Sequence, residues 1–513
     1  MFRESPPPAS AGPREWAALG VLVLAVLLLA VDGTVLALAV PSLSATLDPT
    51  ANQLLWIGDI YSFALAGLLV TMGNLADRIG RKKLLMIGAA CFGVASAIAA
   101  FSPSAEVLIA ARALLGISGA TLMPSTLSII RHMFAVPAQR TRAIAIWSVG
   151  AAGGAALGPV VGGLLLEHFW WGSVFLINIP VMLVLIIAGA FLLPESRNPR
   201  ALPIDLLSSL LSMAAIVPVI YAVKRVVGEG ADFVAIGAGV VGILCGWLFV
   251  RRQQRSADPM LDLELFRLPA FRGAVVSNGF AIFALSGLLF FFSQYLQLVR
   301  GLSPLRAGLV ELPAMLASML VVVFIGIAVA RLGTGGSIGF GLVLGAVGLA
   351  GLAFAESLDG LAVMIAALLV VGFGIGLTST VSTDAVVGSV PRERAGAASA
   401  IAETAYELGV ALGIAILGSL MTAQYRLRLP DLTELPATVA ASARESLAAG
   451  LEALDGAFPA LAGQLQDAFA GGMQTTALVA AGILLVAGVF AWVTIPAKLD
   501  GDDAVVPPVA ATG

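Results

Sequence analysis

Five acidic residues lie inside long apolar stretches of the sequence or close to their ends: Asp32, Asp59, Glu311, Glu403 and Glu407. A carboxylate at the centre of a bilayer costs about 2.5–3.5 kcal/mol on insertion scales, so it normally faces a cavity or a partner. Glu403 and Glu407 are four residues apart and share a helix face, where two ionised carboxylates repel each other. One of the pair is therefore expected to hold a proton until a cation arrives, which is the chemistry of proton–cation exchange.

Aromatic residues accompany these acids at helical spacing. Trp56, Asp59 and Phe63 fall at positions i, i+3 and i+7 of one helix face. An aromatic face attracts organic cations, and the attraction strengthens when the cation leaves water. The pattern predicts a binding site for lipophilic cations that draws on Trp56, Asp59, Tyr61, Phe63, Glu311, Tyr406 and Glu407. The alternative is a structural role, in which each acid pairs with Ser, Thr or Arg112.

The composition is that of a membrane protein. Soluble domains carry about 25% charged residues, whereas this chain carries 12% and is 59% hydrophobic. We expect an all-α integral membrane protein, and its net charge of −3 implies no nucleic-acid partner. Fourteen spans are predicted, at residues 16–40, 52–73, 83–101, 105–130, 142–165, 170–193, 204–224, 231–250, 271–298, 307–330, 335–354, 361–381, 396–423 and 473–495.

Lys and Arg concentrate in the connections that follow the even-numbered spans. By the positive-inside rule these connections face the cytoplasm, which places both termini there, in a protein that crosses the cell membrane many times. The sequence contains no phosphate-binding G-x-x-x-x-G-K-[ST], no H-E-x-x-H and no Cys/His cluster. We therefore expect no enzyme, no cofactor and no metal.

A charged cluster, GNLADRIGRKK at 73–83, lies between spans two and three. Glycine permits a tight turn, and an aspartate accepts hydrogen bonds from a helix N-terminus. The cluster is either a topology signal alone or a gating element built from Gly73, Asp77, Arg78, Gly80, Arg81 and Lys82. In span five, Gly154, Gly158 and Gly162 are spaced for close approach of a neighbouring backbone, and Pro159 introduces a kink or weak point.

An internal repeat is indicated by residues 328–341, AVARLGTGGSIGFG, which look like a reduced copy of the charged cluster. Asp59 precedes Asp77 by eighteen residues, and Glu311 precedes Arg331 by twenty. Spans 1–6 are thus expected to correspond to spans 9–14, although any two polytopic segments share some likeness. Repeated halves with a site at their interface are the architecture of secondary transporters.

The predicted organisation has two six-helix bundles, at 16–200 and 256–495, separated by two inserted helices at 201–255. Tails at 1–15 and 496–513 complete it. The second bundle includes a long outer loop at 425–472, in which residues 442–458 suit an amphipathic helix. That helix caps the outer vestibule, rests on the membrane surface or is decoration.

Four ordered motifs resemble those of the major facilitator superfamily, in its fourteen-span drug:proton antiporter branch. The cluster at 73–83 resembles the signature loop, and the other three are AVDGTVLALAVPSL (30–43), ARALLGISGA (111–120) and GAALGPVVGG (154–163). WIGDIYSFALAG (56–67) and AETAYELG (402–409) resemble segments of quaternary-ammonium exporters. The resemblance implies the major facilitator fold, with two six-helix bundles plus two inserted helices.

The resemblance also implies roles for individual residues. The 73–83 loop would latch the two halves on the cytoplasmic side. Arg112 would neighbour Asp32, because spans one and four are adjacent in the family, and would either tune its proton affinity or form a structural pair. Proton coupling would fall to Asp32, Arg112, Glu403 and Glu407, and the antiporter motif to Gly154, Gly158, Pro159, Gly162 and Gly163.

The expected function is proton-coupled export of lipophilic mono- and dications by a monomer whose partners are these cations, protons and membrane lipid. A second interpretation keeps the transporter but changes the cargo to an anionic, zwitterionic or lipid-like metabolite. A third, a membrane enzyme or receptor, is opposed by the charged cluster and by the repeat.

Overall fold

The computed structural model describes residues 10–197, 205–256, 259, 261–355, 360–390, 395–433, 435–454 and 458–497. Within these ranges the chain forms helices joined by short connections, and no β-strand occurs. The first set of helices is α1 (Pro13–Leu47), α2 (Ala51–Ile79), α3 (Arg81–Ala100), α4 (Ala105–Met133), α5 (Pro137–His168), α6 (Ser173–Leu176) and α7 (Asn178–Leu192). The inserted pair is α8 (Leu206–Glu229) and α9 (Phe233–Arg255).

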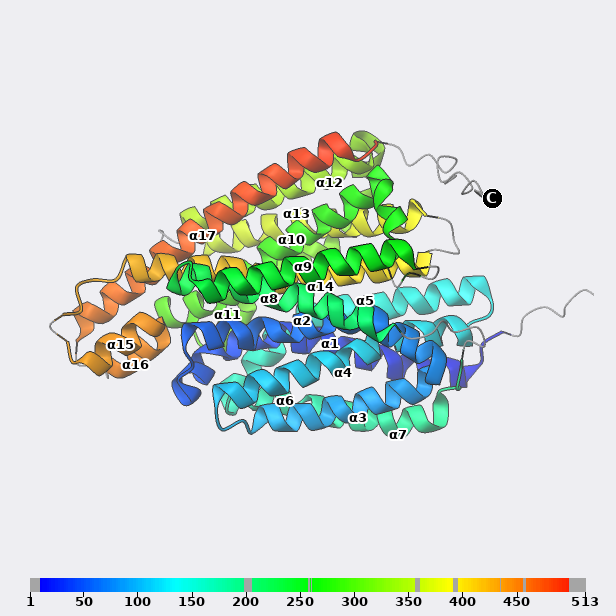
Figure 1. Ribbon diagram of the computed structural model, residues 1–513, viewed down its shortest axis with the longest axis horizontal. Coiled ribbons are helices and arrows are strands. Elements are labelled where there is room, and N and C mark those ends of the chain that lie inside the picture. Colours follow the sequence, from blue (N-terminus) through cyan, green and yellow to red (C-terminus); the bar gives the residue numbers. More distant parts are fainter. Residues whose placement is uncertain are drawn as a thin grey trace, which may run out of the picture.

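The second set begins after a 3₁₀ turn at Leu263–Arg267. It consists of α10 (Pro269–Gln294) with a π-helical end at Tyr295–Val299, α11 (Pro304–Leu320), α12 (Val322–Ala355), α13 (Leu361–Gly388), α14 (Ala395–Leu427), α15 (Ala437–Glu445), α16 (Leu447–Leu454) and α17 (Pro459–Thr494). The start of α1 and the end of α17 lie at the same end of the bundle, which we name the terminal end (Figure 1). The opposite end, which carries α15 and α16, is named the far end.

The two sets pack in the same order. In the first set α1 packs against α5 and α7, α2 against α4, and α3 against α4 and α7. In the second set α10 packs against α14 and α17, α11 against α13, and α12 against α13 and α17. Each helix of the first set thus packs against the same partners as the corresponding helix of the second set, as an internal repeat of six spanning helices requires.

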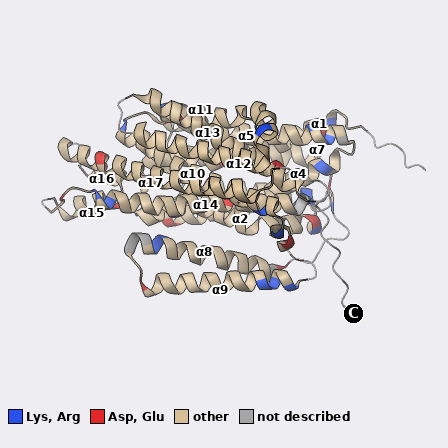
Figure 2. Cartoon of the chain, turned by 90° about the horizontal axis from the view of Figure 1, so that it is seen from above, with Lys and Arg blue, Asp and Glu red and all other residues tan. Residues whose placement is uncertain are grey.

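Two seams join the sets. One lies between α2 and α14, and the other between α5 and α11. The inserted helices α8 and α9 pack against each other, and α8 also packs against α2 and α14. Figure 2 shows this pair at the side of the molecule. The inserted pair therefore covers the α2–α14 seam from outside both sets.

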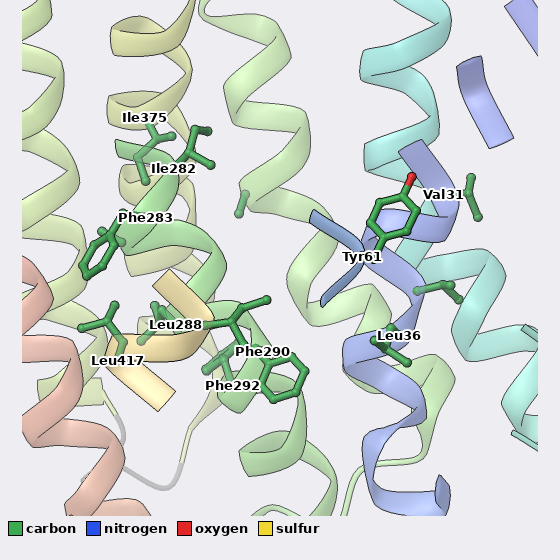
Figure 3. Packing of buried hydrophobic residues seen from close by; sticks show 14 of the residues in the cluster. Val31, Leu36, Tyr61, Ile282, Phe283, Leu288, Phe290, Phe292, Ile375 and Leu417 are labelled. Atoms are coloured by element: carbon green, nitrogen blue, oxygen red, sulfur yellow. The ribbon is translucent and has the colours of Figure 1, made fainter. Parts of the chain in front are cut away.

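The far end is closed by contacts between the sets. Gln297 donates a hydrogen bond to the carbonyl oxygen of Leu38 at 3.1 Å. A Cβ atom added at Gly163 would lie 2.6 Å from the Cα of Leu305, so the backbones of α5 and α11 touch there. Phe290 and Phe292 of α10 belong to the buried apolar cluster that both sets share (Figure 3). These side chains fill the interior between the two sets.

Two corresponding turns lie at the terminal end. Gly80 (φ 114°) separates α2 from α3, and Gly333 (φ 71°) bends α12 at the equivalent place in the second set. Only glycine adopts such positive φ values readily. After each glycine the next N–H donates to the segment that follows the last helix of its set: Arg81 to the Ser196 carbonyl and Thr334 to the Ala497 carbonyl, both at 3.0 Å.

The span count differs from expectation in one place. Thirteen helices of the described chain are long and apolar enough to cross a membrane. The predicted tenth span, 307–330, falls on α11 and on the part of α12 before Gly333, while the eleventh falls on the rest of α12. Gly333 has non-helical backbone angles, so α12 is two helices joined at a kink, and the predicted eleventh span is the second of them.

The connection predicted at 425–472 is shorter in the structure, because its first and last residues belong to α14 and α17. The last helix begins at Pro459 instead of residue 473, and α15 and α16 replace the single helix predicted at 442–458. Ser446 is extended (φ −157°) and its hydroxyl accepts a hydrogen bond from the N–H of Ala449, which caps α16 and separates it from α15. The Tyr425 hydroxyl donates to the Ala443 carbonyl at 2.9 Å and fixes α15 against the end of α14.

Candidate functional site

The first group of buried polar residues is centred on Asp32 of α1. Arg112 of α4 lies in contact with it, with Nη1 3.2 Å from Oδ2. Asn178, at the start of α7, donates to the other carboxylate oxygen at 2.8 Å and to the Ser96 hydroxyl of α3 at 3.1 Å. Both oxygens of Asp32 are thus held by side chains from two further helices.

Arg112 is itself held from two more directions. Its Nε donates to the Ile57 carbonyl of α2 at 3.2 Å, and its guanidinium lies 4.7 Å from the ring centroid of Tyr61. Tyr61 is buried among residues of the apolar core (Figure 3). Tyr61 therefore faces Arg112 and α4, away from the helix face that carries Trp56, Asp59 and Phe63.

The second group joins Asp59 of α2 to Lys224 of the inserted helix α8. The Lys224 Nζ lies 2.6 Å from Asp59 Oδ2 and 3.9 Å from the ring centroid of Trp56. Asp59 is fully buried and Lys224 is 4% exposed. Neither oxygen of Asp59 takes part in a hydrogen bond of regular geometry with any described residue. The carboxylate and the aromatic ring form the two contacts that an organic cation needs, and an ammonium occupies them.

Sequence reasoning missed Lys224 and Asn178. The predicted seventh span ends at residue 224, which places this lysine at the boundary of the membrane. Because α8 continues to Glu229, Lys224 lies within the helix. The available signal for Lys224 was its position on the same helix face as Ile216 and Ile220, at i, i+4 and i+8. The available signal for Asn178 was a lone amide in an apolar span.

Among the acids of the second set, Glu407 lies within electrostatic range of Arg112 and Tyr61 of the first group. Glu407 of α14 is buried and contacts the Ser62 side chain of α2 across the seam, and Glu403 is one turn before it and half-buried. Tyr406 is 38% exposed, so it does not join Phe63, which is buried, and Trp56, which is partly buried. The structure thus brings Glu407 to the α2–α14 seam but leaves Tyr406 at a more open position.

Glu311 of α11 occupies the other seam. It is 3% exposed, and its Oε1 atom has no hydrogen-bond partner in the described part of the chain. The helix that carries it packs against α5 and α13, whereas Asp59 lies on α2 beside α8 and α14. The structure does not bring Glu311 and Asp59 together, and each acid belongs to a separate seam.

In the part of the chain that the structure describes, the ion pair and hydrogen bonds of Asp77, Arg81 and Lys82 lie within the first set. Asp77 and Arg81 form an ion pair along the chain at 2.8 Å. The Lys82 Nζ donates to the Ala190 and Leu193 carbonyls at the end of α7, at 2.7 and 2.9 Å. Gly80 leaves room for the carboxylate of Glu195, which accepts from the Lys82 N–H at 3.2 Å. Gly73 and Arg78 lie beside these residues at the end of α2.

The glycines of span five face two different partners. Side chains added at Gly154, Gly158 and Gly162 would clash with Leu27, Thr34 and Val35 of α1, so this row allows α5 to pack closely on α1. Gly163 instead touches α11, and the carbonyl of Pro159 lies against Gly308 of the same helix. The motif therefore supports packing within the first set and, through its last residues, across the α5–α11 seam.

Comparison with known proteins decides the family. The family model described as Major Facilitator Superfamily matches residues 22–414 of this chain. The chain belongs to this superfamily.

Solved transporters of this fold resemble it over nearly their whole length at low identity. A bacterial homolog of the human lysosomal transporter Spinster, inward-facing and occupied, gives a TM-score of 0.65 at 16% identity over 94% of this chain and 97% of that one. The peptide transporter POT in complex with sulfate gives 0.62 at 17% identity, over 93% and 95%.

Several curated superfamily members are similar in sequence. The multidrug efflux pump LfrA of Mycolicibacterium smegmatis is 48% identical over 92% of this chain and 95% of its own. The methyl viologen resistance protein SmvA of Salmonella typhimurium is 40% identical over 81% and 85%. The tetracenomycin C resistance and export protein of Streptomyces glaucescens is 32% identical over 95% and 93%. This superfamily member is thus a multi-pass membrane transporter, and relatives of this kind are transporters, not enzymes.

Proposed function

We propose that this protein is a proton-coupled antiporter that exports lipophilic mono- and dicationic compounds from the cell by alternating access. The observation that carries the proposal is the pair formed by the buried Asp59 carboxylate and the partly buried Trp56 ring, which hold an ammonium group at 2.6 Å and 3.9 Å. A carboxylate beside an aromatic face binds organic cations most strongly when both are desolvated. The names of LfrA, as a multidrug efflux pump, and SmvA, as a methyl viologen resistance protein, support the same substrate class.

In this proposal Asp32 carries the coupled proton. Arg112 and Asn178 hold its two oxygens in place, so a change of protonation at Asp32 alters contacts to α4 and α7 at once. Glu403 and Glu407 at the α2–α14 seam form the rest of the proton path. Glu311, in the opposite seam, adds negative charge for substrates that carry two positive charges.

The gating proposal assigns the latch to the cluster at 73–83 and to the Gly-rich part of span five. Contacts between the sets lie at the far end, at Gln297 and at Gly163, while the named contacts of Asp77 and Lys82 stay inside the first set. This arrangement fits a state closed at the far end, with the latch released. The proposed location is the cell membrane, with the terminal end in the cytoplasm and the protein as a monomer.

A second candidate is export of a non-cationic metabolite or lipid-like compound. The buried Lys224 favours it, because it adds a second basic residue to Arg112. Both bases, however, lie against carboxylates, at 2.6 and 3.2 Å, which leaves little positive charge for an anionic cargo.

Reconstitution of the purified protein into proteoliposomes with a pH gradient tests the proposal. Ethidium, a monocation, and methyl viologen, a dication, should each drive proton flux and accumulate against their gradients, whereas an anionic dye should do neither. Proton flux driven by the anion, or none with either cation, would contradict the proposal.

A further inference from the structure

We propose that Lys224 is a resident cation of the Asp59–Trp56 site, which an exported organic cation must displace before it can bind. The inference rests on the proposed function and deepens it, because it makes the inserted helix α8 a determinant of substrate selection. Its ammonium makes both contacts expected of a substrate, 2.6 Å to the Asp59 carboxylate and 3.9 Å to the Trp56 ring centroid.

The position of Lys224 is set by a small apolar cluster in which α8 meets the seam. Phe63 of α2 packs there with Ala411 and Ala415 of α14, and Ile216 and Ile220 of α8 cover them. Ile216, Ile220 and Lys224 follow at i, i+4 and i+8, so the same face of α8 that packs on the seam delivers the lysine. Since α8 belongs to neither six-helix set, the ammonium is supplied to the site from outside.

The Asp59–Lys224 contact is built for exchange. Both oxygens of Asp59 lack a hydrogen bond of regular geometry to the residues described, so the carboxylate keeps acceptor capacity for a ligand. A lysine ammonium is a point charge on a flexible four-carbon stem, which can leave without moving its backbone. Lys224 lies near the end of α8, five residues before Glu229, so its stem is long enough to carry the charge toward water at the far end.

The resident cation has a selective consequence. With Lys224 in place Asp59 is neutralised, and a cation gains the carboxylate only by competing with a tethered ammonium whose effective concentration is about millimolar. A small hydrated cation would make no contact with Asp59 that the lysine ammonium does not already make. A lipophilic aromatic cation gains the apolar surface of Phe63 and Trp56 in addition, so the site favours that class.

The test compares ethidium binding to purified full-length variants in detergent. Lys224→Met, which keeps the stem but removes the charge, should lower the apparent Kd for ethidium by about tenfold or more, because the competitor is gone. Lys224→Arg should remain at or above the wild-type Kd. The matched control is Arg225→Met, which removes the adjacent base that pairs with the half-exposed Asp232 at 2.9 Å and should leave the Kd unchanged. Equal or weaker ethidium binding by folded Lys224→Met would overturn the inference.

A second experiment measures the accessibility of Lys224 in the wild-type protein, so it does not depend on whether a variant folds. Reductive methylation followed by mass spectrometry should modify Lys224 slowly without ligand, since it is 4% exposed, and faster with saturating ethidium. The reference is Lys82, at the other end of the molecule, whose labelling should not change. Unchanged labelling of Lys224 would overturn the inference. If neither wild type nor Lys224→Met binds ethidium, the proposed function fails as well; if wild type binds and Lys224→Met binds no tighter, only the resident cation is refuted.

Discussion

The two buried ion pairs among the described residues of this transporter differ in how completely each carboxylate is held. Asp32 has a partner at each oxygen, Arg112 at 3.2 Å and Asn178 at 2.8 Å, all from the first six-helix set. The Asp59 carboxylate lies 2.6 Å from the Lys224 ammonium of the inserted helix, and neither of its oxygens makes a hydrogen bond of regular geometry with a described residue. A fully held carboxylate can report its protonation to several helices, whereas a carboxylate with one flexible partner can exchange that partner. The difference suggests that proton coupling and cation binding are divided between the two pairs.

The largest effect is expected from removal of the titratable group in the fully held pair. Asp32→Asn should reduce pH-driven accumulation of ethidium to the level of empty liposomes, because an amide cannot release a proton. Ethidium binding in detergent should survive, and Asp232→Asn, at a half-exposed acid between the inserted helices, is the control. If the variant still concentrates ethidium, the coupled proton lies elsewhere, with Glu403 and Glu407 as the next candidates.

The next effect concerns the exchangeable pair. Asp59→Asn should weaken ethidium binding about 10- to 100-fold, the size of a charged contact of about 1.5–3 kcal/mol. Accumulation at saturating ethidium should remain dependent on the pH gradient, since Asp32 is intact. Titration of fluorescence in detergent gives the Kd. An unchanged Kd would place the cation site away from Asp59 and remove the contrast between the pairs.

A smaller effect sharpens the account of how Asp32 is held. Asn178→Ala leaves a carboxylate oxygen of Asp32 without its 2.8 Å donor, which should cost about 1–3 kcal/mol of stability. Thermal unfolding in detergent measures it, with Ser212→Ala on the inserted helix as a polar control near the seam. Export should fall while ethidium affinity stays constant. A fall in affinity instead would show that the two pairs share one site.

The smallest effect is expected in the opposite seam. A dication needs two inward protons for neutral exchange, and each charge moved against the membrane potential costs about 2.3 kcal/mol per 100 mV. Glu311→Gln should therefore impair methyl viologen export more than ethidium export, with a selectivity shift of about fivefold, equivalent to an interaction of roughly 1 kcal/mol. Equal losses for both dyes would assign Glu311 to structure or to the common proton path.

The family and the repeated organisation could be predicted from the sequence because they depend on local patterns. These patterns are the long apolar stretches, the glycine at each terminal-end turn and the spacing of the acids. All three can be recognised without knowledge of the packing. The neighbours Asp32 and Arg112 were also expected, but from the family resemblance. Their third partner, Asn178, was not, since a single amide has no periodic signal.

Lys224 and the far-end helices show what local patterns miss. A lysine near the end of an apolar stretch ordinarily reaches toward the interface, so its burial depends on which helix happens to lie opposite. Only tertiary packing sets Trp56 and Asp59 there. In the same way, residues 459–472 are less apolar than a typical span, and their helix is an extension of α17 beyond the expected membrane boundary.

The turns at Gly80 and Gly333 have a mechanical consequence. Each ties the start of the third spanning helix of a set to the chain just beyond its last helix, through a backbone hydrogen bond of 3.0 Å. The tie uses peptide groups and one glycine, so it holds whether or not the neighbouring side chains are charged. In each set, the third spanning helix is thereby connected to the chain that follows the last helix at the terminal end. A force on one of these two helices is therefore passed to the other. We therefore expect motion between conformations to occur mainly at the two seams, where the two sets meet.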